Sequence, residues 1–204
     1  MTIILVSFIS CKEAAQEVQS TDSNESCEYE QIAETKRSPQ SIDELTDLIN
    51  ELPKPLSIPC LVESFTRPLK VNLTLSSLSA QPAVGRTSPR IFIFYGDLVL
   101  SIVPEGKGAY LLEASFMYTD STSLKAEYEF PIGEKIQYAY PFDRIKTDSG
   151  INGEGTVCRA CHNDEKVDNA ASVSGAFTSV AIKPESSMSL SSFKVELSNC
   201  EFHK

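Results

Sequence analysis

The stretch 124–130 reads Leu-Lys-Ala-Glu-Tyr-Glu-Phe, and it carries the clearest secondary-structure signal in the chain. Apolar side chains at 124, 126, 128 and 130 alternate with charged side chains at 125, 127 and 129. Successive side chains of a strand point to opposite faces of a sheet, so this alternation predicts a strand with one apolar and one polar face. The stretch therefore favours a β fold.

Further strand signals lie on both sides of this stretch. Runs of apolar, β-branched and aromatic residues predict strands at 71–75, 91–95, 98–103, 110–118, 136–140 and 177–182. Short strands that follow one another without helices predict a mainly β fold, either an antiparallel sandwich or a barrel-like sheet.

Two segments have helical spacing. A helix is expected at 41–52, because Ser41 and Glu44 form a capping box, apolar residues recur every three or four positions, and Pro53 ends the pattern. The apolar residues of 190–200 fit a strand as well as a helix, and we favour a C-terminal helix there.

The composition limits the classes of partner. The chain has 204 residues, of which 41% are hydrophobic, which is enough for the core of one domain. Its formal net charge is −10 at pH 7. Phosphate groups repel such a chain, so we expect no nucleic-acid partner and no attraction to anionic lipid head groups.

The N-terminus has the features of an export signal. Residues 2–10 are nearly all apolar or small, and Phe8-Ile9-Ser10-Cys11 resembles a bacterial lipobox, in which the cysteine is lipidated. We expect a signal segment at 1–11, a polar flexible tether at 12–40, and a β-rich domain at 41–204. This organisation predicts a lipoprotein of the cell envelope, anchored through Cys11 and facing the periplasm or cell surface. An ordinary cleaved signal or a buried N-terminal strand are the alternatives.

One motif is chemically specific: Cys158-Arg159-Ala160-Cys161-His162, in an expected loop near 150–169. The spacing of Cys158 and Cys161 lets both sulfurs reach the two vinyl groups of one haem, and His162 can then bind the iron as an axial ligand. Covalent attachment of haem c takes place outside the cytoplasm, which agrees with the export signal. Met188 is the expected sixth ligand, with Met117 and His203 as weaker candidates.

Zinc and a disulfide are the competing readings of the same cysteines. Cys158, Cys161, Cys200 and His203 form a ligand set for a tetrahedral structural zinc site. Alternatively, Cys158 and Cys161 form a plain disulfide. If Cys158 and Cys161 bind haem and Cys11 is lipidated, Cys27 and Cys60 can form a disulfide. Cys200 then stays free or pairs outside this chain.

No hydrolytic or nucleotide-binding pattern is visible. The chain has two histidines, His162 and His203, so a Ser-His-Asp arrangement would need one of them. No glycine-rich phosphate loop follows a predicted strand. The expected function is therefore electron transfer or haem-based sensing in the cell envelope, with an unidentified redox partner. The alternative is a non-enzymatic structural or interaction lipoprotein whose cysteines bind zinc or form a disulfide.

The order of several short segments resembles a known group of proteins. Leu-Pro-Lys-Pro at 52–55, Ser-Pro-Arg-Ile-Phe-Ile-Phe at 88–94, Asp-Leu-Val-Leu-Ser-Ile-Val-Pro at 97–104 and Glu-Phe-Pro-Ile at 129–132 precede the Cys-x-x-Cys-His motif. This order looks like that of uncharacterised exported bacterial proteins labelled cytochrome c-like, over roughly residues 40–200. The resemblance implies export and a bound haem, and it implies no substrate.

Overall fold

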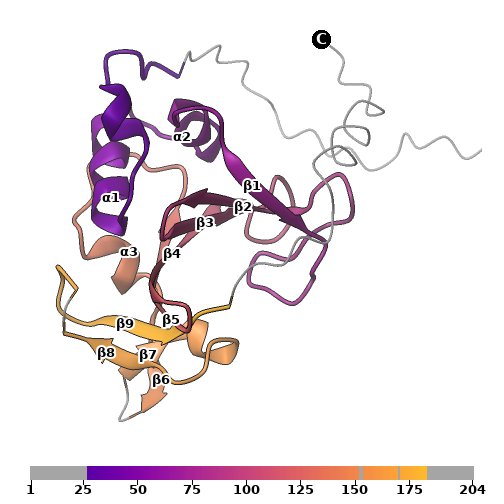
Figure 1. Ribbon diagram of the computed structural model, residues 1–204, viewed down its shortest axis with the longest axis vertical. Coiled ribbons are helices and arrows are strands. Elements are labelled where there is room, and N and C mark those ends of the chain that lie inside the picture. Colours follow the sequence, from indigo (N-terminus) through magenta and orange to yellow (C-terminus); the bar gives the residue numbers. More distant parts are fainter. Residues whose placement is uncertain (1–26, 152–153, 170, 183–204) are drawn as a thin grey trace, which may run out of the picture.

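A computed structural model describes residues 27–151, 154–169 and 171–182 (Figure 1). Several expectations fall outside these residues: the signal segment with Cys11, the ligand candidates Met188, Cys200 and His203, and the C-terminal helix. In chain order, the elements are η1 (Glu34–Arg37), α1 (Ile42–Glu51), α2 (Ile58–Ser64), β1 (Lys70–Thr74), β2 (Arg90–Tyr95), β3 (Leu98–Ile102), β4 (Leu111–Thr119), β5 (Thr122–Glu129), α3 (Tyr140–Asp143), β6 (Lys146–Ile151), β7 (Glu154–Thr156), η2 (Val157–Ala160), β8 (Lys166–Asp168) and β9 (Ala176–Val180).

The fold is built on one antiparallel sheet. Its seven strands lie in the order β1-β2-β3-β4-β5-β9-β8, and β6 and β7 form a separate two-stranded sheet. The first five strands are consecutive in sequence, as short connections between antiparallel neighbours favour. The predicted mainly β, antiparallel class is confirmed. The sheet does not close into a barrel, because β1 and β8 are not hydrogen-bonded to each other.

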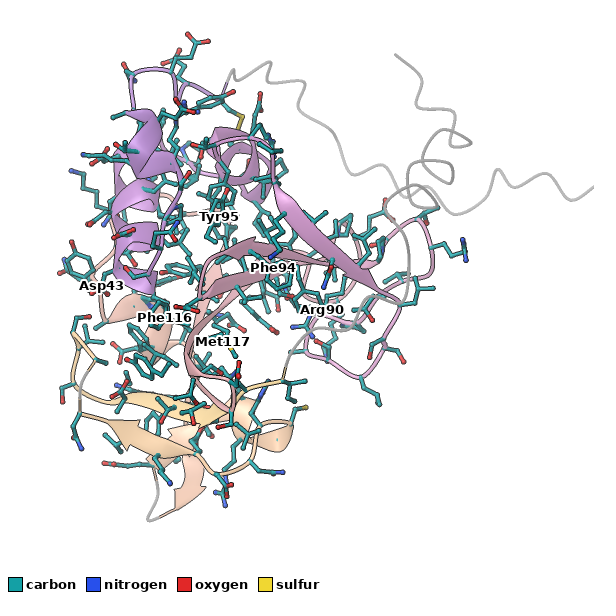
Figure 2. The ribbon with its side chains drawn as sticks, viewed as in Figure 1. Asp43, Arg90, Phe94, Tyr95, Phe116 and Met117 are labelled. Carbon is teal, nitrogen blue, oxygen red and sulfur yellow. A yellow bond between two sulfur atoms is a disulfide. The ribbon has the colours of Figure 1, made fainter. Side chains whose placement is uncertain are left out.

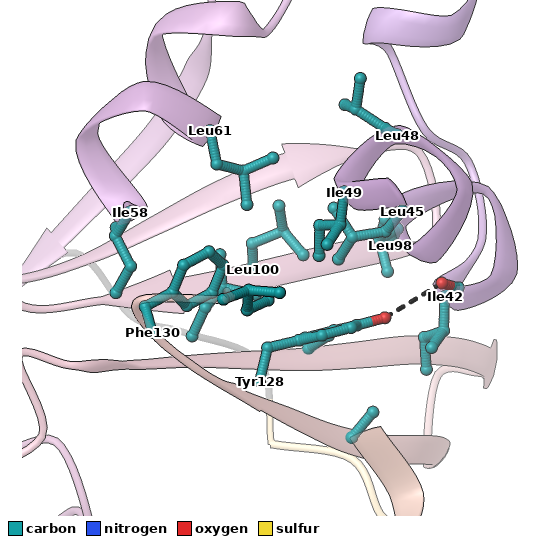
Figure 3. Packing of buried hydrophobic residues seen from close by; sticks show 14 of the residues in the cluster. Ile42, Leu45, Leu48, Ile49, Ile58, Leu61, Leu98, Leu100, Tyr128 and Phe130 are labelled. Carbon is teal, nitrogen blue, oxygen red and sulfur yellow. Dashed lines mark hydrogen bonds between the residues drawn. The ribbon is translucent and has the colours of Figure 1, made fainter. Parts of the chain in front are cut away.

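The apolar face of β5 forms the core with the helices. Tyr128 is fully buried in β5, and it lies in register with Leu112 of β4. Its hydroxyl donates to the Ile42 carbonyl oxygen at 3.1 Å, which ties the sheet to the first turn of α1 (Figure 3). Apolar residues of α1 and α2 cover the same face, among them Leu45, Leu48, Ile49 and Leu61. The alternation at 124–130 therefore predicted the buried face correctly.

Helix α1 begins and ends as its sequence predicts. The Ser41 hydroxyl accepts the Glu44 backbone N–H at 3.1 Å. The Glu44 carboxylate in turn accepts the Gln40 backbone N–H at 2.7 Å, one residue before the cap. These bonds satisfy donors that the first helical turn leaves free.

The expected tether is wrong where the structure describes it, over residues 27–40. Ile32 is buried in the core and Cys27 forms a disulfide with Cys60 of α2. The Thr66 backbone N–H also donates to the Arg37 carbonyl oxygen at 3.0 Å. One buried apolar side chain and one covalent bond hold this segment, and neither produces a periodic pattern in sequence.

Three other expectations need correction. Residues 136–139 form no strand, because the Asn50 side chain takes the place of a strand partner by bonding both backbone groups of Ile136. Helix α2 was not expected, although Ser57 caps it and Pro59 lies in its first turn. The segment 150–169 was expected to be a loop, but it contains the end of β6 as well as β7, η2 and β8.

Candidate functional site

The Cys-x-x-Cys-His motif forms one helical turn directly after β7. Cys158 lies in η2, and the backbone N–H groups of Cys161 and His162 both donate to its carbonyl oxygen, at 3.1 and 2.9 Å. This turn brings Cys158, Cys161 and His162 into one compact segment. The predicted proximity of Cys158, Cys161 and His162 is thus present in the structure.

Thr156 and Glu165 hold the turn in place. The Thr156 hydroxyl accepts the Cys158 backbone N–H at 3.2 Å and donates to the Glu165 carboxylate. The Thr156 backbone N–H donates to the other Glu165 carboxylate oxygen at 2.9 Å. Because Glu165 receives both donors of Thr156, it fixes the start of η2 to the residues that follow the motif.

The imidazole of His162 is oriented by β9. Its Nδ1 lies 2.8 Å from the carbonyl oxygen of Val180. A carbonyl oxygen only accepts, so we assign the proton to Nδ1, which leaves the Nε2 lone pair free. Burial lowers the pKa of His162, and the positive charges of Lys125 and Arg90 lower it further. The ring is therefore neutral at pH 7, the form in which histidine binds metal.

The two thiols differ in their surroundings. Cys161 is exposed, whereas Cys158 is partly buried, and neither forms a disulfide in the structure. Burial raises the pKa of the Cys158 thiol to about 11. Since the thiolate is the nucleophilic form, Cys158 is not poised for thiol catalysis at neutral pH.

A buried lysine, Lys125, lies on the polar face of the sheet and interacts electrostatically with Cys158 of the motif. Lys125 of β5 is 7% exposed, and its ammonium donates to the hydroxyls of Ser123 at 2.7 Å and Ser115 at 3.2 Å. Burial lowers the pKa of Lys125 to about 8, while the neighbouring groups of Cys158 and Glu113 act in the opposite direction. The alternation at 124–130 predicted a polar face here but not that it is covered.

Arg90 and Glu113 extend this polar face across the sheet. The Arg90 guanidinium donates to the Ser101 hydroxyl at 2.6 Å and forms an ion pair with the Glu113 carboxylate (Figure 2). Burial raises the pKa of Glu113, and the charges of Arg90 and Lys125 oppose that rise. Sequence reasoning missed this cluster, because the contributing residues lie on three strands that only the sheet brings together.

Register connects Lys125 to His162. Ser123 lies opposite Ser179 of β9, and the next residue of β9, Val180, accepts the His162 bond. The hydroxyl of Ser179 is buried and has no hydrogen-bond partner in the described part of the chain. Met117 of β4 lies in register with Ser123, so it points to the same face as Lys125. Lys125, Met117 and Ser179 therefore share one face of the sheet, and the His162 turn is bonded to the residue that follows Ser179.

Haem fits the motif residues in one respect. The free Nε2 of His162 is in the state that an iron ligand needs, with Nδ1 held by a backbone carbonyl. Val157, next to Cys158 in the chain, is 57% exposed, so the motif is open to solvent on that side.

Zinc finds no complete site in the described residues. No group of three or more His, Cys, Asp or Glu side chains is arranged there to hold a metal ion. The other two ligands of the expected zinc site, Cys200 and His203, lie outside those residues. The Cys3His zinc site therefore stays a prediction.

Two surface pockets of the described chain lie elsewhere. One, of about 760 Å³, lies beside α3 and is lined by residues of 129–144. Arg144 at its edge is bound to the carboxylates of Glu127 and Glu129. The second, of about 310 Å³, lies along α1. Neither pocket contains a residue of the motif.

Comparisons with protein-family models, with curated proteins and with solved structures find no match to this chain. The resemblance to cytochrome c-like exported proteins therefore stays a prediction that rests on the quoted segments. Across the described residues, no helix has both the length and the apolar character needed to cross a membrane.

Proposed function

We propose that this chain is an exported c-type haem protein, in which Cys158 and Cys161 bind one haem through thioethers and His162 is an axial ligand of the iron. The observation that supports this most is the 2.8 Å contact between His162 Nδ1 and the Val180 carbonyl oxygen. That contact sets the tautomer and orientation of the ring toward a metal at Nε2. A bound haem would supply a one-electron iron couple.

The residues around the motif have defined roles in this proposal. Thr156 and Glu165 hold the turn that presents both thiols. Val180 orients His162 through its carbonyl oxygen. Met188 remains the proposed sixth ligand, and Met117 is a second candidate because it shares the face of Lys125.

We place the protein in the cell envelope, held by a lipid at Cys11, where it transfers electrons to or from a redox partner or senses through its haem. The short stretch of apolar residues before Cys11 supports the anchor.

A structural or interaction role without haem is the second candidate. It is favoured by the charged, hydrogen-bonded sheet face near Cys158, since cofactor sites are usually lined by apolar side chains. In that case the cysteines bind zinc or form a disulfide, and the protein is a colourless lipoprotein.

The test is covalent haem on the full chain, made in a host that matures c-type cytochromes. We expect one iron per chain and a Soret band that survives acid-acetone extraction. Changing both Cys158 and Cys161 to Ser should abolish covalent haem, and His162→Ala should shift the ferrous bands while haem stays attached.

The matched control is His203→Ala, which changes the chain's other histidine. With Met188 as the sixth ligand, this variant keeps the wild-type ferrous bands, whereas shifted bands would identify His203 as the sixth ligand. One zinc per chain, lost on changing Cys200 or His203, would instead establish the structural site. A colourless protein without metal would leave the disulfide.

A further inference from the structure

A fixed positive charge lies on the sheet face next to the Cys-x-x-Cys-His turn. The Lys125 ammonium is nearly fully buried and is held by two serine hydroxyls, so it has no freedom to swing into solvent. Arg90 of β2 lies three strands away and is held by Ser101 and Glu113. Both cations are therefore parts of the folded framework rather than mobile surface charges.

Lys125 is joined to His162 by a short structural path. Its ammonium bonds Ser123, Ser123 lies opposite Ser179, and the carbonyl of the next residue, Val180, holds His162 Nδ1. Lys125 therefore lies on the strand adjacent to the one whose carbonyl oxygen orients the ring.

We propose that Lys125, supported by Arg90, is a positioning residue that raises the reduction potential of haem iron bound by His162. This inference rests on the proposed function. Reduction of ferric to ferrous iron adds one electron and no proton, so it lowers the positive charge of the site by one. A nearby cation destabilises the ferric state more than the ferrous state. The effect is stronger for a buried charge, because water screens it less.

The experiment compares reduction potentials of haem-loaded full-length variants. Each is titrated in the presence of mediators, with dithionite as the electron donor and ferricyanide as the acceptor. Lys125→Met removes the charge and keeps most of the volume, and Lys125→Arg keeps the charge. Lys146→Met is the matched control: it removes an equal charge from a side chain that is 38% exposed and bonded to Asp143. Lys146 lies in register with Thr156, close to the same turn.

We expect a lower potential in Lys125→Met, a value near wild type in Lys125→Arg, and a smaller shift in Lys146→Met that shrinks further at high salt. Thermal unfolding of each variant accompanies the titration as a second readout. Equal potentials in wild type and Lys125→Met, with haem attached, would overturn this inference alone. A shift in Lys125→Arg as large as in Lys125→Met would also overturn it, since packing and not charge would then be responsible. Absence of covalent haem in wild type would overturn the proposed function and this inference together.

Discussion

The Cys27–Cys60 disulfide should be a main source of stability, and its removal tests the packing of the N-terminal segment. The bond closes a loop with a sequence separation of 33 residues that contains η1 and α1. A cross-link over a loop of this length removes chain entropy from the unfolded state worth about 4 kcal/mol. For a chain of this size, a change of that magnitude corresponds to a fall in Tm of about 8–16 °C.

The perturbation is the double variant Cys27→Ser, Cys60→Ser, compared with wild type by urea and thermal unfolding. Reducing agent should destabilise wild type by the same amount and leave the double variant unchanged. Ile32 and Arg37 hold the segment through packing and hydrogen bonds as well, so the variant should keep its fold and its cooperativity. The double variant Cys158→Ser, Cys161→Ser, made in a host without haem maturation, is the control for loss of two cysteines.

Two results would refute the reasoning. The first is a loss of stability below about 1 kcal/mol, which would mean that the cross-link does not restrict the unfolded chain as the loop length requires. The second comes from alkylation of the unreduced, denatured protein followed by peptide mass mapping. Labels on Cys27 and Cys60 would show that these residues are free thiols.

Three further predictions follow from other parts of the molecule. Tyr128→Phe should lower the free energy of unfolding by about 1 kcal/mol, because the lost hydroxyl bonds Ile42 and Thr46 in the core while Thr46 still bonds the Ile42 carbonyl. Urea unfolding measures this loss against the control Tyr110→Phe, in which an exposed hydroxyl is removed. An equal loss of stability in both variants would contradict the prediction. The lowered pKa of Lys125 means that, between about pH 8 and its usual value of 10.5, the unfolded chain binds a proton that the folded chain does not. Lys125 should therefore contribute a rise in stability of up to about 1.4 kcal/mol per pH unit across that window, and the raised pKa of the Cys158 thiol opposes this rise above about pH 9. Urea unfolding should give a more positive slope of stability against pH in wild type than in Lys125→Met, and parallel pH profiles would sink the idea. Cys11→Ala should release the protein from the membrane fraction, and unchanged fractionation with no lipid label on wild type would rule out the lipobox.

Local chemistry in the sequence was enough for much of the fold. The alternation at 124–130 predicted β5 and its buried face. Successive side chains of a strand point to opposite faces of the sheet, so the apolar positions mark the face that is buried. Ser41 and Pro53 bracket α1, since a cap and a proline act within one turn of the helix they bound. Spacing also showed that Cys158, Cys161 and His162 lie within five residues of one another, but the sequence predicted a loop there and not the helical turn that the structure has.

Only the tertiary structure decided what covers each surface. The sequence predicted a tether over residues 12–40 and a loop over 150–169, because Ile32 and the Thr156–Glu165 bonds are single contacts without periodicity. The same limit applies to Lys125. Its position in the alternation marks a polar face, but Ser115, Ser123, Glu113 and Arg90 come from strands paired across the sheet. Burial and charge at that face depend on which strands become neighbours, and that is a property of the folded sheet and not of any one segment.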